Sequence, residues 1–194
     1  VSELISEEKG RWIDHVTAHA DAGVRVYSVG KEATVLGKKG VRKLKHPTAV
    51  GGLAINPKGK RLAVSHYNGV SLWWLGAEGN ATVLEWKGSH LNLAWSPDGD
   101  YVISIMQENS LHGWRLSDNE HMRMTGYGAK VRSMAFTRRG HFLATGGADA
   151  IICWPFTGGG PMGRAPLEFG YAGGAPVTAV ASNPKHDVLA AGFE

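Results

Sequence analysis

The stretch KGSHLNLAWSPDGDYVISIMQENSLHGW, residues 87–114, decides the fold, because it predicts three short strands joined by two reversals. The first strand covers residues 90–95 and stops at Ser96-Pro97-Asp98-Gly99, where proline fixes φ and glycine supplies a positive φ. The second covers residues 101–106, and the polar run QENS separates it from a third strand that ends at Trp114. A three-strand meander cannot bury both of its faces, so it requires further copies of itself.

Copies of this unit recur at intervals of about 40 residues. Turn glycines stand at positions 59, 99 and 140, which are 40 and 41 residues apart, and a tryptophan follows each of them after 14 or 15 residues. These tryptophans are Trp73, Trp114 and Trp154. Repetition at this period, with about four short strands in each copy, predicts an all-β protein: a β-propeller with one four-stranded antiparallel blade per repeat.

The repeats divide the chain into four to five blades that form one domain over residues 1–194. The expected blades cover residues 12–45, 48–86, 89–124 and 129–169, and a half blade covers residues 175–194. Residues 1–6 are expected to form the outermost strand of a preceding blade. Because the half blade lacks a third strand to meet it, the sequence predicts an open arc that is part of a larger ring.

The chain resembles the WD-repeat propellers, and more closely an uncharacterised bacterial branch whose members have seven blades. The segments that carry the resemblance are EEKGRWID, HYNGVSLWW, EWKGSHL, MQENSLHGWR and GADAIICWPF, and it covers nearly the whole chain. It implies that the expected blades are part of a seven-bladed ring. Function in a propeller is built onto loops and the central channel, so we expect a non-catalytic scaffold that binds a protein or peptide partner.

WD-repeat blades are tied internally by a network of His, Ser or Thr, Asp and Trp side chains. The resemblance places this structural network at Ser104, Trp114, Thr145, Asp149, Trp154 and Trp73. This sequence departs from the family pattern, because Trp74, Arg115 and Pro155 replace the Asp after each Trp and no Gly-His pair heads a repeat. We therefore expect apolar packing of the tryptophans to hold the blades more than hydrogen bonding does.

Two sets of loops share one face of the expected propeller: those from an outer strand to the next inner strand, and those between second and third strands. The partner-binding residues expected there are Arg11, His66, Tyr67, Asn68, Lys87, His90, Gln107, Glu108, Tyr127 and Lys130. Aromatic, basic and amide groups of this kind suit a peptide or an acidic side chain. The alternative is that Asn68, Glu108 and Asp149, which occupy equivalent places, are turn formers.

Nine histidines raise a second possibility, a propeller enzyme or metal-dependent protein. Its site would use His66 and His90 with Glu108 or Asp149 near the channel mouth. The spacing argues against it, because the sequence has no Cys pair, no His-Glu-x-x-His run, no Gly-x-Ser-x-Gly elbow and no phosphate loop. We expect no catalytic residue, no cofactor and no metal.

A net charge of +4 and a basic cluster make nucleic acid a further possibility. The cluster consists of Lys38, Lys39, Arg42, Lys43 and Lys45. These cations alternate with apolar residues, as on a solvated edge strand, and no aromatic accompanies them to stack bases. Nucleic acid is therefore not the expected partner.

The single cysteine, Cys153, cannot form an internal disulfide and stands in a strand before Trp154. We expect a buried, unreactive thiol, no disulfide-linked partner and a cytoplasmic location. No apolar run approaches the length of about 18 residues that a membrane span needs, so no membrane partner is expected.

Overall fold

The computed structural model describes residues 4–171 and 173–194, and within them it contains sixteen strands whose pairings are all antiparallel. No helix in these ranges is long and apolar enough to cross a membrane. The all-β architecture predicted from the sequence is confirmed.

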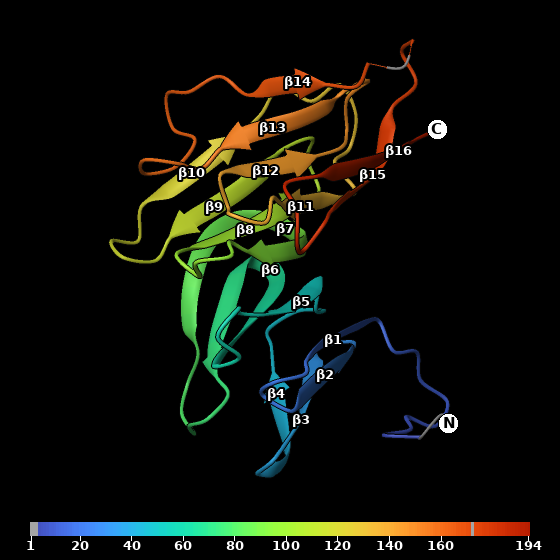
Figure 1. Ribbon diagram of the computed structural model, residues 1–194. Helices are drawn as coiled ribbons and strands as arrows, with labels where there is room; N and C mark the ends of the chain where they lie inside the picture. The colour runs from blue at the N-terminus through green and yellow to red at the C-terminus, as the bar shows by residue number, and fades with distance from the viewer. Residues whose placement is uncertain (1–3, 172) are drawn as a thin grey trace.

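The strands form four sheets (Figure 1). The first consists of β1 (His15–His19), β2 (Val24–Val29), β3 (Glu32–Gly37) and β4 (Gly40–Lys45). The second consists of β5 (Gly52–Ile55), β6 (Arg61–Trp74), β7 (Thr82–Trp95), β8 (Tyr101–Met106), β9 (Leu111–Arg115) and β10 (His121–Met124). The third consists of β11 (Met134–Phe136), β12 (Phe142–Thr145), β13 (Ile151–Pro155) and β14 (Leu167–Phe169), and the fourth pairs β15 (Val177–Ser182) with β16 (Leu189–Phe193).

The six-stranded sheet is two blades joined at β7. Strand β6 reverses at Asn68, whose φ is 67°, and the Leu75 amide donates to the Lys60 carbonyl at 2.9 Å, so its two halves lie side by side. The first half of β7 pairs with β6 and the second half with β8. Gly88 stands between the halves with a φ of 122°. The sequence predicts two strands in place of each of β6 and β7. Each half of β6 and of β7 corresponds to one of the predicted strands, and the structure differs only in that β6 and β7 run without a break between their halves.

We number the blades along the chain. Blade 1 is β1–β4; blade 2 is β5, β6 and the first half of β7; blade 3 is the second half of β7 with β8–β10; blade 4 is β11–β14; and β15–β16 are the half blade. Figure 1 shows them following one another in an arc, from the blue first sheet to the red strands. In the described residues, β1 is paired in a sheet with β2 alone and β16 with β15 alone.

Apolar side chains of neighbouring blades interlock in four cores, one at each boundary. Leu44 of blade 1 packs with Leu62 of blade 2, and Leu84 of blade 2 packs with Val102 of blade 3. Ile103 of blade 3 and Leu143 of blade 4 belong to the third core. The fourth joins blade 4 to the half blade and contains Cys153, whose pKa is raised by burial. Each blade thus buries at least one face against a neighbouring blade, as in stacked repeats.

The repeated turns take the conformation that the sequence predicts. Gly59, Gly99 and Gly140 have φ values of 66°, 83° and 72°, a region that residues with a Cβ rarely occupy. The turn before β6 is fixed further by Asn56, whose Oδ1 accepts from two backbone amides at 2.8 and 2.9 Å.

The outer strand expected over residues 1–6 is not formed in the part of that segment that the structure describes. Residues 1–3 lie outside the described residues, and Leu4–Ser6 belong to no strand. Leu4 and Ile5 are exposed.

Candidate protein-binding surface

Two neighbouring hollows lie on the loop face, one of about 660 Å³ beside blade 2 and one of about 500 Å³ at the boundary of blades 2 and 3. Both are lined by Tyr67, Trp86 and Lys87, so they flank one shared ridge. We call the two hollows and this ridge the blade 2–3 groove. Its other lining residues are Pro47, Thr48, His66, Asn68, Val83, Glu85, Gly88, Ser89, Met106, Gln107, Glu108 and Arg123.

Hydrogen bonds fix the turn that carries Tyr67. The Tyr67 amide donates to Thr48 Oγ1 at 2.9 Å, and Asn68 Oδ1 accepts from the Gly88 amide at 3.1 Å. Asn68 has a left-handed φ, which its short polar side chain tolerates better than most. The Tyr67 side chain itself is 48% exposed. A fixed backbone therefore presents an accessible aromatic ring, the side-chain type most favoured at protein interfaces.

Charges of both signs surround the ring. Lys87 and Arg123 supply cations, and Glu85 and Glu108 supply carboxylates; all four residues are exposed. Gln107 is tied to the next blade, because Lys130 Nζ donates to its Oε1 at 2.9 Å. An aromatic anchor within a polar, two-signed rim is suited to a peptide or a protein loop.

Three residues predicted for this surface are buried instead. His66, His90 and Tyr127 have exposed fractions of 4%, 1% and 8%, so the prediction of accessible side chains at these positions is wrong, although His66 lines one of the two hollows. The physical reason is that each polar ring has a hydroxyl partner inside the blade. Arg11 lies outside the groove, where it pairs with Glu8 at 3.8 Å.

In blade 4, Tyr127 joins two of the predicted network residues. Trp154 Nε1 donates to the Tyr127 hydroxyl at 2.6 Å, and that hydroxyl lies 2.8 Å from Thr145 Oγ1. Because Thr145 donates its own proton to the Ile152 carbonyl at 3.1 Å, Tyr127 is the donor to Thr145. Burial raises the pKa of Tyr127 to about 12, which keeps the phenol protonated. Asp149 is exposed and takes no part in this chain of bonds.

Blades 2 and 3 contain related contacts built on histidine. His90 Nδ1 lies 2.7 Å from Ser104 Oγ, and the ring of Trp114 packs 5.6 Å from the His90 ring. In blade 2, Trp73 Nε1 donates to His46 Nε2 at 3.1 Å. That bond requires a neutral imidazole, and burial lowers the pKa of His46 to about 4. Buried hydrogen bonds therefore accompany the packing of the tryptophans, and the expectation that packing contributes more than hydrogen bonding stays a prediction.

One position in the repeat supplies a side chain to each of these contacts, a role that the sequence analysis did not predict. His46, Trp86 and Tyr127 each stand 13 residues before a turn glycine, and each contacts the strand-ending tryptophan of the blade that follows it or the histidine ring beside that tryptophan. Trp86, in the first half of β7, stacks on His112 of blade 3 with ring centroids 3.9 Å apart. The constant spacing of 13 residues before the turn glycine is the sequence signal that could have identified this position. It was hidden because three different residue types occupy the position.

The geometry does not favour the alternative of a catalytic or metal site built from His66 and His90 with a carboxylate. His66 Nε2 lies 2.8 Å from Ser71 Oγ, and His90 is held by Ser104, so both rings are engaged inside their blades. Across the described part of the chain, no three His, Cys, Asp or Glu side chains are grouped so that they could hold a metal ion.

Comparisons with known proteins agree with this architecture. Residues 119–154 match the family model "WD domain, G-beta repeat", so the chain contains a WD40 repeat. It is also similar to "Cell division cycle 20.1, cofactor of APC complex" of Arabidopsis thaliana, with 32% identity over 73 residues. That stretch covers 37% of this chain and 16% of the relative. Both findings support the presence of WD repeats in this chain.

Proposed function

We propose that this protein is a non-catalytic WD-repeat scaffold that binds a protein or peptide partner through the blade 2–3 groove. The observation that carries the proposal is Tyr67, an exposed aromatic side chain on a turn fixed by Thr48 and Asn68, with a hollow on each side. Aromatic anchors that border pockets dominate the energetics of many protein interfaces.

Two further considerations support binding as the activity. The groove combines Lys87 and Arg123 with Glu85 and Glu108, which gives charge complementarity for orienting a partner. The Arabidopsis relative is named as a cofactor of a complex, a role carried out within an assembly. The proposal places the protein in the cytoplasm, as the lone cysteine suggests, and retains the kinship with bacterial seven-bladed propellers expected from the sequence.

The test compares two double variants in a quantitative partner-capture assay. Tyr67→Ala with Lys87→Ala should reduce capture of the specific partner by roughly ten-fold or more, because both side chains line both hollows. Its melting temperature should stay near that of the unsubstituted protein, since both residues are exposed. The matched control is Tyr171→Ala with Lys185→Ala, an exposed tyrosine and lysine outside the groove. Equal capture by the groove variant and the control would contradict the proposal.

A further inference from the structure

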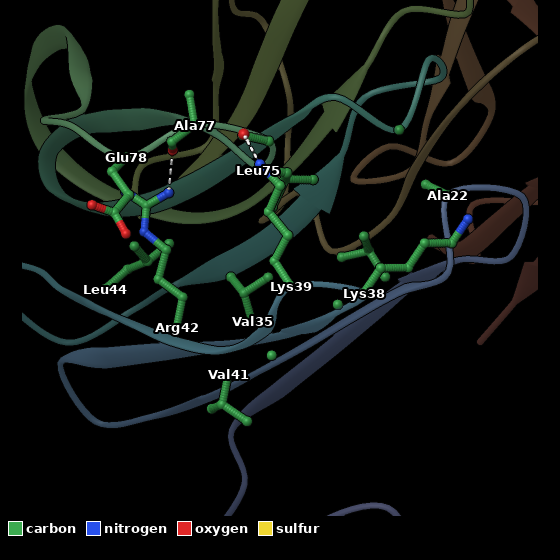
Figure 2. Close-up of a pocket in the computed structure, with 15 residues that line it drawn as sticks. Ala22, Val35, Lys38, Lys39, Val41, Arg42, Leu44, Leu75, Ala77 and Glu78 are labelled. Carbon is green, nitrogen blue, oxygen red and sulfur yellow. Dashed lines mark hydrogen bonds between the residues drawn. The ribbon is translucent and has the colours of Figure 1, made fainter.

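A hollow of about 560 Å³ lies at the boundary of blades 1 and 2, on the face opposite the loop face. Its walls are the turn between β3 and β4, the connection from β6 to β7, and the turns that contain Ala22 and Gly59 (Figure 2). We call it the blade 1–2 hollow. It shares no lining residue with the blade 2–3 groove, so a ligand there would be bound independently of the proposed partner.

The inner wall of the hollow is apolar. Val35 and Leu44 are buried in the core between blades 1 and 2, and Val24 and Leu75 pack against that core while keeping part of their surface accessible. These aliphatic side chains form a wall that one aliphatic side chain of a ligand could cover. The volume of the hollow, about 560 Å³, falls within the range typical of ligand sites, roughly 300 to 1,000 Å³.

The rim carries cations whose charge is not neutralised. Arg42 donates to the carbonyls of Trp74, Ala77 and Gly79 at 2.7 to 3.1 Å, and Lys39 donates to the Gly76 carbonyl at 2.8 Å. Carbonyl oxygens orient these groups without cancelling their charge, in contrast to the carboxylate that pairs with Lys43 outside the hollow.

Lys38 completes the rim. Its side chain extends toward Ala22 in Figure 2, and Lys38 Cε lies 3.4 Å from the place that a Cβ on Gly23 would take. Among the lining residues, Glu78 is the one carboxylate against the three cations Lys38, Lys39 and Arg42. The mouth therefore favours a ligand that carries negative charge.

The aliphatic inner wall and the cationic rim together indicate the chemistry of a ligand that would fit the hollow. We propose that the blade 1–2 hollow is a docking site for a partner segment that carries an aliphatic side chain next to one or two carboxylates. The aliphatic side chain covers Val24 and Leu75, and the carboxylates face Lys38, Lys39 and Arg42. A nucleic acid shares the negative charge, but the lining residues include no aromatic ring on which a base could stack.

The hollow can be filled without disturbing its walls. Gly37 lines it, its φ is outside the left-handed region, and an added Cβ would meet Val24 Cγ2 at 3.7 Å, an ordinary contact. Gly37→Leu should therefore block the hollow and leave the fold intact. Lys38→Glu reverses one rim charge, and no hydrogen bond of its ammonium group stabilises the described structure. The matched control is Lys185→Glu, the same charge change at an exposed turn on the same face.

The experiment selects short random peptides, displayed on phage, against the full protein and repeats the selection against Gly37→Leu. Peptides enriched on the unsubstituted protein and lost on Gly37→Leu should contain an aliphatic residue beside Asp or Glu. For the best such peptide, fluorescence anisotropy should show at least about ten-fold weaker binding to Lys38→Glu and less than about a two-fold change for Lys185→Glu.

Three outcomes would overturn the proposal. The first is that no enriched peptide depends on Gly37 although Gly37→Leu keeps the melting temperature of the unsubstituted protein. The second is equal weakening by Lys38→Glu and Lys185→Glu, which would mean diffuse electrostatic attraction. The third is single-stranded DNA that binds more tightly than the selected peptide and competes with it, which would make the hollow a nucleic-acid contact.

Discussion

Blade 3 and blade 1 have the same four-strand topology but differ in how completely they are buried. Every residue of β8 in blade 3 is buried, whereas β1 of blade 1 alternates between half-buried and exposed residues, and Val16 is 73% exposed. Blade 3 contributes to apolar cores on both of its faces, and blade 1 contributes to one. The difference shows that a blade obtains its stability mainly from the sheets that cover it, as expected for repeat architectures.

The largest expected effect is at the tryptophan that ends β9. Trp114 is 3% exposed and belongs to the core between blades 2 and 3, so Trp114→Ala should lower the free energy of unfolding by about 3 to 5 kcal/mol. Trp12→Ala, at a residue of the first repeat that is 86% exposed, is the control and should change it by less than about 0.5 kcal/mol. Denaturant unfolding measures both values. Equal losses from the two substitutions would remove the contrast between the blades.

Blade 3 should also give the molecule a stability that depends on pH, through the buried His112. His112 of β9 is fully buried with no hydrogen-bond partner for either ring nitrogen; its ring stacks on Trp86 at 3.9 Å and lies 5.4 Å from the ring of His121. Burial, with the nearby charges of His121, His90 and Arg123, lowers the pKa of His112 to about 3.

The sign of that dependence follows from proton uptake. Between about pH 6.5 and pH 3, His112 binds a proton in the unfolded chain and not in the folded one, so stability falls as pH falls. This residue alone contributes a slope of about 1.4 kcal/mol per pH unit. His112→Phe should keep the ring stacking, remove two unpaired polar atoms and flatten the unfolding free energy between pH 6 and 4 by about that slope. Parallel pH profiles for the two proteins would show that His112 is not held neutral.

The contrast between blades also separates what the sequence could predict from what it could not. Gly59, Gly99 and Gly140 mark turns that local chemistry determines, so their spacing predicted the strands and the architecture. The sequence analysis placed His90 and Tyr127 on the loop face. In the structure their side chains are buried inside the blades, where they form hydrogen bonds with Ser104 and Thr145. Such partners are distant in sequence and differ from blade to blade, so no motif reveals them.

The residues of the blade 2–3 groove were partly predictable, because many of them lie in or near turns. The sequence analysis placed on the loop face five residues that line the groove: Tyr67, Asn68, Lys87, Gln107 and Glu108. Trp86 and Arg123 were missed, because they belong to outer strands whose relation to the loop face depends on the bend of β7. That bend depends on Gly88, whose amide bonds to Asn68 across the blade boundary.

The smallest expected effect is at the exposed face of blade 1, where it tests whether that face is covered in solution. Val16 lies beside Leu4, Ile5 and Ile13 around a largely apolar hollow of about 510 Å³. In dilute protein, Val16→Thr should change the free energy of unfolding by less than about 0.5 kcal/mol, because its methyl groups already contact water. Exposed apolar surface favours association, so sedimentation velocity at increasing concentration should show less self-association for this variant than for the unsubstituted protein. A dilute-solution loss above about 1.5 kcal/mol would instead mean that another surface covers Val16, and that blade 1 is buried on both faces as blade 3 is.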